Sequence, residues 1–190
     1  MTWVIWLTGC PGAGKTSVAF EFVKLLEDSV PFEMLRLDEF RKKLVPEPKY
    51  TEDERDLVYN ALGVLAAFLV KHGCNVIVDA TAHRKKWRDR ARAQIDNFYE
   101  IYIKCPMDTC MQRESERKDN LIVSELYKKA IKRKKKLERG EPVEKSEVGE
   151  VIGVDVPYEE PENPELVIQS DEITPGEGAK MVYEIVYGKG

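Results

Sequence analysis

The clearest chemical signal in the sequence is a glycine-rich stretch close to its beginning. Residues 9–16 read Gly-Cys-Pro-Gly-Ala-Gly-Lys-Thr, which fits the pattern G-x-x-x-x-G-K-[ST] of a phosphate-binding loop. Its glycines allow successive backbone N–H groups to face one anion, and the helix that follows adds its positive dipole end. Lys15 should reach the β- and γ-phosphates of ATP, and the Thr16 hydroxyl should bind Mg²⁺. The residues expected to bind ATP are Gly9, Cys10, Pro11, Gly12, Ala13, Gly14, Lys15, Thr16 and Ser17.

Two acidic residues follow apolar stretches and are therefore candidates for the reaction itself. Asp79 ends the run Asn-Val-Ile-Val-Asp, and in phosphate-loop proteins such an acid often holds Mg²⁺. An N-cap of the next helix is the alternative. Asp38 could take the proton of an attacking hydroxyl, and Arg41 could bind an acceptor phosphate or sulfate in a planar fork. A surface ion pair is the alternative for Asp38 and Arg41.

Further basic residues could hold a second anion. Arg88 and Arg92 are four apart and share one helix face, although a solvated basic helix would show the same spacing. Arg113 and Arg117 could belong to a lid that contacts the nucleotide. His83 begins the basic helix near the expected site, but no other feature of the sequence supports a role for it.

The apolar patterns indicate how these residues are positioned. Strands are expected at 2–8, 32–37, 75–79, 98–104 and 166–168, with helical patterns between them and after the last. Thr51 with Glu54 reads as a capping box of one helix, and His72 as its C-cap. This alternation predicts an α/β phosphate-loop NTPase fold, a parallel five-stranded sheet with helices on both faces. We expect a single domain over 1–190 with a helical lid at about 113–153.

Composition narrows the class of protein. Of 190 residues, 43% are hydrophobic and 34% charged, and the net charge of −4 argues against a general nucleic-acid-binding surface. The four cysteines lack C-x-x-C spacing, which indicates reduced thiols. With neither a leader pattern nor an apolar run long enough for a membrane span, we expect a cytoplasmic protein without membrane contact.

Several motifs together resemble the adenylylsulfate kinase family. The most particular match is residues 153–165, Gly-Val-Asp-Val-Pro-Tyr-Glu-Glu-Pro-Glu-Asn-Pro-Glu, close to that family's Gly-Val/Ile-Asp-x-Pro-Tyr-Glu-x-Pro segment. The other matches are Trp-Leu-Thr-Gly at 6–9, Thr-Glu-Asp-Glu-Arg at 51–55, Arg-Asp-Arg-Ala-Arg at 88–92, Cys-Met-Gln-Arg at 110–113 and Leu-Tyr-Lys-Lys-Ala at 126–130. The likeness covers nearly the whole chain.

The resemblance implies an ATP- and Mg²⁺-dependent kinase that phosphorylates the ribose 3′-hydroxyl of adenosine 5′-phosphosulfate (APS), usually as a homodimer. By position it makes Asp38 the candidate base and places Arg113 against the adenine of ATP. Candidates for binding the anionic acceptor are Asp38, Arg41, Arg55, Arg88, Arg92 and Lys128.

The departures from the family pattern fall mostly on the acceptor side. The family's Asp-Gly-Asp-Asn-Val-Arg reads Arg-Leu-Asp-Glu-Phe-Arg at 36–41, its Arg-Glu-Glu-Asn reads Arg-Asp-Leu-Val at 55–58, and its Ile-Ser-Pro-Phe/Tyr reads Thr-Ala-His-Arg at 81–84. Its Phe-Thr-Gly has become Val-Ile-Gly at 151–153. Two other functions therefore stay open: a polynucleotide 5′-hydroxyl kinase or other small-molecule kinase, and an ATP-binding regulator without transfer activity.

Overall fold

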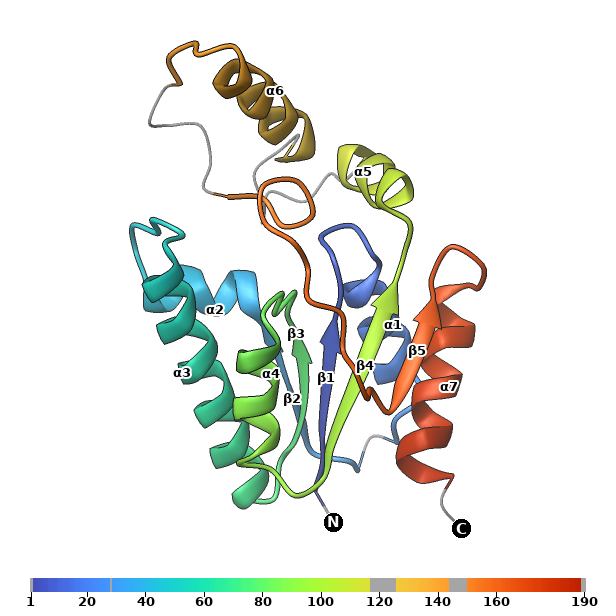
Figure 1. Ribbon diagram of the computed structural model, residues 1–190. Coiled ribbons are helices and arrows are strands. Elements are labelled where there is room, and N and C mark those ends of the chain that lie inside the picture. The colour runs from blue at the N-terminus through green and yellow to red at the C-terminus, as the bar shows by residue number, and fades with distance from the viewer. Residues whose placement is uncertain (1, 28, 117–125, 144–149, 189–190) are drawn as a thin grey trace.

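A computed structural model gives the structure of the protein, and it describes residues 2–27, 29–116, 126–143 and 150–188. Its centre is a parallel sheet with strand order β2-β3-β1-β4-β5 (Figure 1). The strands are β1 (Val4–Thr8), β2 (Phe32–Arg36), β3 (Asn75–Asp79), β4 (Phe98–Lys104) and β5 (Leu166–Gln169). The predicted parallel five-stranded sheet is confirmed.

Helices cover both faces of this sheet, as predicted. The helices are α1 (Lys15–Val23), α2 (Leu37–Leu44), α3 (Glu52–Lys71), α4 (Lys85–Arg92), α5 (Met107–Glu116), α6 (Leu126–Glu138) and α7 (Pro175–Tyr187). Successive strand residues point to opposite faces, so Trp6 packs with α3 and α4 whereas Ile5 and Leu7 pack with α1 and α7. Helices α5 and α6 lie beyond the carboxyl ends of the strands (Figure 1).

Some boundaries differ from the expectation. Strand β2 ends at Arg36, because Leu37 already begins α2, a short helix that the apolar pattern did not reveal. The helix expected over 119–139 is described from Leu126 onward, and Arg117 lies outside the described residues. Along the described chain, no helix is both long and apolar enough to cross a membrane.

Candidate active site

The phosphate loop connects β1 to α1 and has the backbone that its glycines permit. Gly12 and Gly14 have positive φ angles of 80° and 103°. A Cβ atom on Gly12 would overlap the carbonyl oxygen of Cys110, so the loop passes close to α5. Gly14 is the N-cap of α1 in the left-handed conformation, which leaves the first N–H groups of that helix directed at the loop.

Lys15 is buried and its ammonium group lies across the loop. Its Nζ donates to the carbonyl oxygens of Gly9 and Cys10, at 2.9 and 3.0 Å. These are neutral acceptors, and phosphate oxygens would be stronger partners for the same three N–H groups. Burial raises the pKa of the neighbouring Cys10 thiol. All four cysteines are free thiols in the structure, in line with the predicted reduced state.

Thr16 and Asp79 meet at the start of α1, as the sequence predicted for a metal site. The Thr16 hydroxyl donates to Asp79 Oδ2 at 2.6 Å, because β3 pairs with β1 and sets Asp79 beside Leu7. The N-cap alternative for Asp79 is wrong, since α4 begins only at Lys85. A hydroxyl and one carboxylate suit Mg²⁺, which usually binds one or two protein oxygens together with substrate phosphates.

Arg113 reaches the phosphate loop from α5. Its Nη1 donates to Ser170 Oγ at 3.1 Å and its Nη2 to the Ser170 carbonyl oxygen at 2.8 Å. The Ser170 hydroxyl in turn donates to the carbonyl oxygen of Ala13 at 2.6 Å. Arg113 is therefore held beside the loop, where the predicted contact with the adenine of ATP stays a prediction.

Three of the predicted acceptor residues carry charges that affect the pKa of Tyr59. Burial raises the pKa of Tyr59 to about 12, the positive charges of Arg41 and Arg55 lower it, and Asp38 raises it. Asp38 and Arg41 come from α2, while Arg55 and Tyr59 come from α3. The fold thus brings together residues that the sequence could associate only through the resemblance.

Arg41 and Arg55 are both buried, which contradicts the surface alternative for Arg41. Arg41 Nη1 donates to Glu54 at 2.7 Å and its guanidinium lies 5.0 Å from the ring centre of Tyr50. Arg55 donates to the carbonyl oxygens of Tyr50 and Glu150, at 3.0 and 2.7 Å. None of these bonds uses Arg41 Nη2 or Arg55 Nη1, and these are the nitrogens that could donate to a bound anion.

Glu54 explains why the predicted capping box is only half present. The Thr51 side chain accepts from the Glu54 backbone N–H, as predicted. The Glu54 carboxylate, however, accepts from Arg41 and from the backbone N–H groups of Lys49 and Tyr50 instead of that of Thr51. The helix start is therefore tied to the acceptor side of the site.

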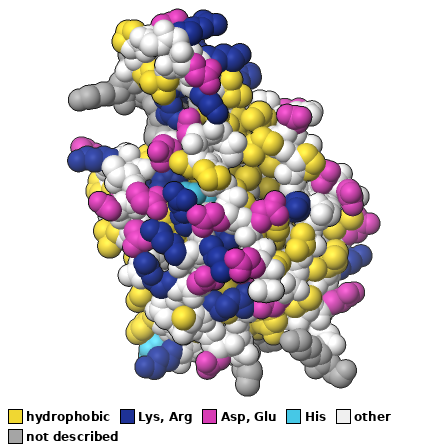
Figure 2. Space-filling view, in the orientation of Figure 1, with side chains coloured by type: hydrophobic (Ala, Val, Ile, Leu, Met, Phe, Trp, Pro, Cys, Tyr) yellow, Lys and Arg dark blue, Asp and Glu magenta, His cyan; other side chains and the backbone are white. Residues whose placement is uncertain are grey.

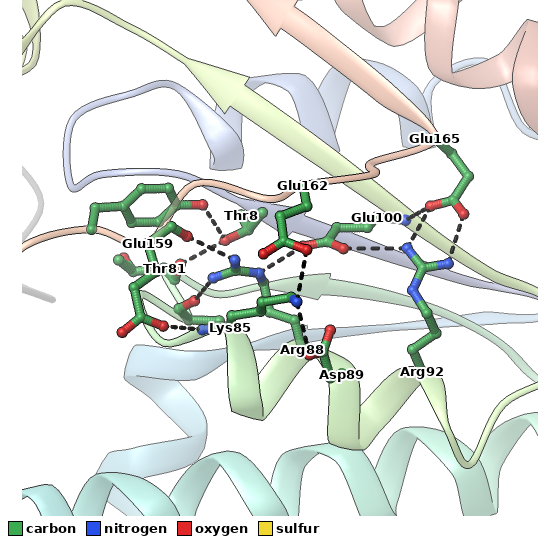
Figure 3. A network of polar contacts seen from close by, with 12 residues as sticks. Thr8, Thr81, Lys85, Arg88, Asp89, Arg92, Glu100, Glu159, Glu162 and Glu165 are labelled. Carbon is green, nitrogen blue, oxygen red and sulfur yellow. Dashed lines mark hydrogen bonds and ion pairs between the residues drawn. The ribbon is translucent and has the colours of Figure 1, made fainter.

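Arg88 and Arg92 have different surroundings from those expected of acceptor-binding residues. Arg88 is 1% exposed, and its three nitrogens donate to Glu100 Oε1 at 2.6 Å, to the Glu159 carbonyl oxygen at 2.7 Å and to the Ala82 carbonyl oxygen. Arg92 is paired with Glu165 and Glu100 (Figure 3). Every nitrogen of Arg88 is engaged, so these contacts do not support an acceptor-binding role, which stays a prediction.

The Arg88 network fastens the segment 158–165, here called the strap, to the body of the protein. The Glu159 carboxylate accepts from the Lys85 backbone N–H at 2.7 Å and from Arg84 at 2.9 Å, so it caps α4 from 74 residues away. These bonds hold the pKa of Glu159 below its ordinary value. The Tyr158 hydroxyl lies 2.7 Å from the hydroxyl of Thr8, the residue directly before the phosphate loop.

The segment expected to form a lid also contacts the phosphate loop. Tyr127 of α6 donates to the carbonyl oxygen of Pro11 at 2.8 Å. Gly153 lies so close to Met107 that a Cβ atom there would overlap the Met107 side chain. Lys128 is exposed on α6, in the upper part of the molecule where basic side chains gather (Figure 2). Its predicted substrate contact stays a prediction.

Three residues that shape the site were not singled out from the sequence: Tyr158, Glu100 and Ser170. Tyr158 belongs to the 153–165 match, which could have drawn attention to it. Glu100 is an acidic residue inside an otherwise apolar strand, where a buried partner is needed. Ser170 follows the last strand directly, at the edge where ligands bind in open α/β sheets.

Known proteins agree with this architecture. Residues 1–169 match the model of the family described as adenylylsulphate kinase. A probable adenylyl-sulfate kinase of Archaeoglobus fulgidus is 34% identical over 90% of this chain and 97% of its own, and the adenylyl-sulfate kinase of Rippkaea orientalis is 31% identical over 95% and 88%. The structure of the Mycobacterium tuberculosis APS kinase in complex with AMPPNP and APS has a TM-score of 0.76 and 27% identity, with 97% of both chains covered. Because the family match spans most of the sequence, the chain belongs to the adenylylsulfate kinase family.

Proposed function

We propose that this protein transfers the γ-phosphoryl group of ATP to the 3′-hydroxyl of APS, giving 3′-phosphoadenosine 5′-phosphosulfate. The observation that carries this proposal is the pairing of two sites at the carboxyl edge of the sheet. The phosphate loop with Lys15 and Thr16 forms the donor side. Asp38, Arg41 and Arg55 would form the acceptor side, which combines a carboxylate with two buried cations.

Each residue has a chemical task in this reaction. The Lys15 ammonium would leave the loop carbonyls and stabilise charge that develops on the transferring phosphoryl group. Asp38 would accept the proton of the attacking hydroxyl. Arg41 and Arg55 would bind the acceptor's anionic group and so orient that hydroxyl. Thr16 and Asp79 would hold Mg²⁺, which when bound would supply positive charge that offsets the charge of the phosphates.

The decisive experiment offers the purified chain several acceptors with γ-labelled ATP and Mg²⁺. We expect label on APS at its 3′-position, and Lys15→Ala should abolish it. Label on a 5′-hydroxyl oligonucleotide but not on APS would favour the polynucleotide kinase reading. ATP binding without label on any acceptor would favour the regulator reading. Either of these results would refute the proposal.

Family membership also motivates a proposal about assembly. We expect a homodimer, as the resemblance implies, and light scattering on the purified chain measures the molar mass directly. A molar mass equal to one chain of 21.8 kDa across the micromolar range would refute it.

A further inference from the structure

One buried polar atom, Nδ1 of His83, has no role in the reaction described so far. His83 lies in the loop between β3 and α4, four residues after Asp79, and its side chain is 1% exposed. Across the residues that the structure describes, nothing forms a hydrogen bond with its Nδ1. An unsatisfied buried polar atom costs about 1–3 kcal/mol, so its presence calls for an explanation such as an ordered water or a ligand.

Both the backbone and the ring of His83 make contacts with neighbouring elements. Its carbonyl oxygen accepts from the Glu159 N–H at 2.9 Å. Its ring meets Trp87 edge-on at 4.9 Å, and Trp87 stacks on Tyr59 at 4.2 Å. The Tyr59 hydroxyl accepts from the backbone N–H of Ala82 at 2.9 Å. His83 therefore belongs to the same aromatic wall around which the acceptor-side charges gather.

The charges around the ring keep it neutral. Burial lowers the pKa of His83 to about 3, the positive charges of Arg55, Arg84 and Arg88 lower it too, and only Glu159 raises it. Among these charges, that of Arg55 has the largest effect on the pKa of His83, so the ring is within the electrostatic influence of an acceptor-side residue. A neutral imidazole binds an anion less strongly than an arginine does. It is well suited to a hydrogen bond with a neutral polar group.

We propose that His83 is a specificity-determining residue, whose Nδ1 forms a hydrogen bond with a neutral polar group of the acceptor nucleotide. The group is an amino or hydroxyl function, on either the base or the ribose. This inference rests on the proposed function, because it supposes that a nucleotide occupies the acceptor side. It fits the general rule that a site with an unpaired polar group rejects analogues that cannot satisfy it.

Two variants separate recognition from packing. His83→Asn keeps a polar atom near the position of Nδ1, while His83→Leu has a similar volume without any polar atom. A hydrogen bond between neutral groups contributes about 0.5–1.5 kcal/mol, which corresponds to about 2- to 12-fold. We expect the KM for APS to rise by this factor in His83→Leu, with KM for ATP unchanged, and to stay within about twofold of wild type in His83→Asn.

Stability gives an independent readout. Because His83→Leu removes an unsatisfied atom, we expect its thermal midpoint to equal or exceed that of the wild type. A residue with only a structural role would instead lose stability and activity together. If His83→Leu does not fold, the wild type compared across substrate analogues still decides the matter, because equal efficiency with APS and both analogues overturns the inference.

The analogues identify the group that His83 contacts. An APS analogue with hypoxanthine in place of adenine has a carbonyl oxygen instead of the amino group, and 2′-deoxy-APS lacks one hydroxyl. The wild type should lose efficiency with one of them, and His83→Leu should lose little further. If all enzymes discriminate equally among the three acceptors, or if His83→Leu has an unchanged KM for APS, the inference is overturned. Wild-type turnover of APS itself tests the proposed function separately.

Discussion

The pair formed by Arg88 and Glu100 offers a quantitative test of how this chain uses its basic residues. Glu100 is 5% exposed and its Oε1 lies 2.6 Å from Arg88 Nε, while its Oε2 lies 3.2 Å from Arg92 Nη2. If Arg88 stabilises the fold, the charge of Glu100 is needed for folding. If Arg88 serves chiefly to bind the acceptor, Glu100 matters little for stability.

The substitution Glu100→Gln keeps the shape and one acceptor but removes the charge. Removing one partner of a buried ion pair costs about 3–5 kcal/mol, because the other charge is left uncompensated. Arg92 is partly exposed and adds little. Since glutamine retains an acceptor for Arg88, we expect a loss of about 2–4 kcal/mol. For a chain of this size that lowers the thermal midpoint by about 5–15 °C.

The matched control is Glu162→Gln, a substitution of an exposed glutamate on the strap. Glu162 pairs with Lys85 at 2.9 Å, but its side chain is 66% exposed, so the loss should stay below about 0.5 kcal/mol. Urea unfolding followed by far-UV circular dichroism gives both values. If Glu100→Gln unfolds within 0.5 kcal/mol of the wild type, about the loss set for the exposed pair, the structural role assigned to Arg88 is refuted.

Three further predictions concern the reaction and the strap. Lys15→Ala should lower turnover at least about 10²-fold in a γ-label assay and leave the circular dichroism spectrum unchanged, since Lys15 bonds only carbonyls of its own loop. Asp38→Asn should lower turnover about 10²- to 10⁴-fold while ATP affinity by calorimetry is retained; near-normal turnover would exclude Asp38 as the base. The pKa of Glu159 is lowered by its bonds to the Lys85 N–H and to Arg84, so its stabilisation is present above the ordinary glutamate pKa of about 4.3 and is lost as the pH falls through the lowered value. Wild type and Glu159→Gln should therefore differ in unfolding free energy at pH 7 and converge once the pH has fallen below the lowered pKa; a difference that stays constant as the pH falls would refute this.

The donor side could be predicted from the sequence because its determinants are local. The residues of the phosphate loop are contiguous, and the φ angles of Gly12 and Gly14 are those that the motif requires. Asp79 was also predictable, since the carboxyl end of a strand beside the loop can face only a few groups. Its hydrogen bond with Thr16 depends on the pairing of β3 with β1, which sets Asp79 beside Leu7.

The partners of the basic helix α4 could not be predicted in the same way. The spacing of Arg88 and Arg92 places them on one face, but it does not reveal what that face meets. Their partners come from β4 and from the strap, so Arg92 and Glu165 are 73 residues apart in the sequence. The same spacing of arginines in the sequence is expected whether they bind a substrate anion or a carboxylate of their own chain. Only the tertiary contacts distinguish the two cases.

The loop at 80–84 shows how these distant contacts bear on the site. Ala82 has a φ of 41°, a conformation that costs a residue with a side chain about 1–3 kcal/mol. The Ala82 N–H donates to the Tyr59 hydroxyl, and the Ala82 carbonyl oxygen accepts from Arg88. Residues of α3 and α4 therefore both fix the loop. The family pattern has a proline where His83 stands, and a proline would stiffen the same backbone through its own ring. Because long-range hydrogen bonds hold this loop, the fold does not depend on a proline ring at position 83, and a polar side chain can stand there.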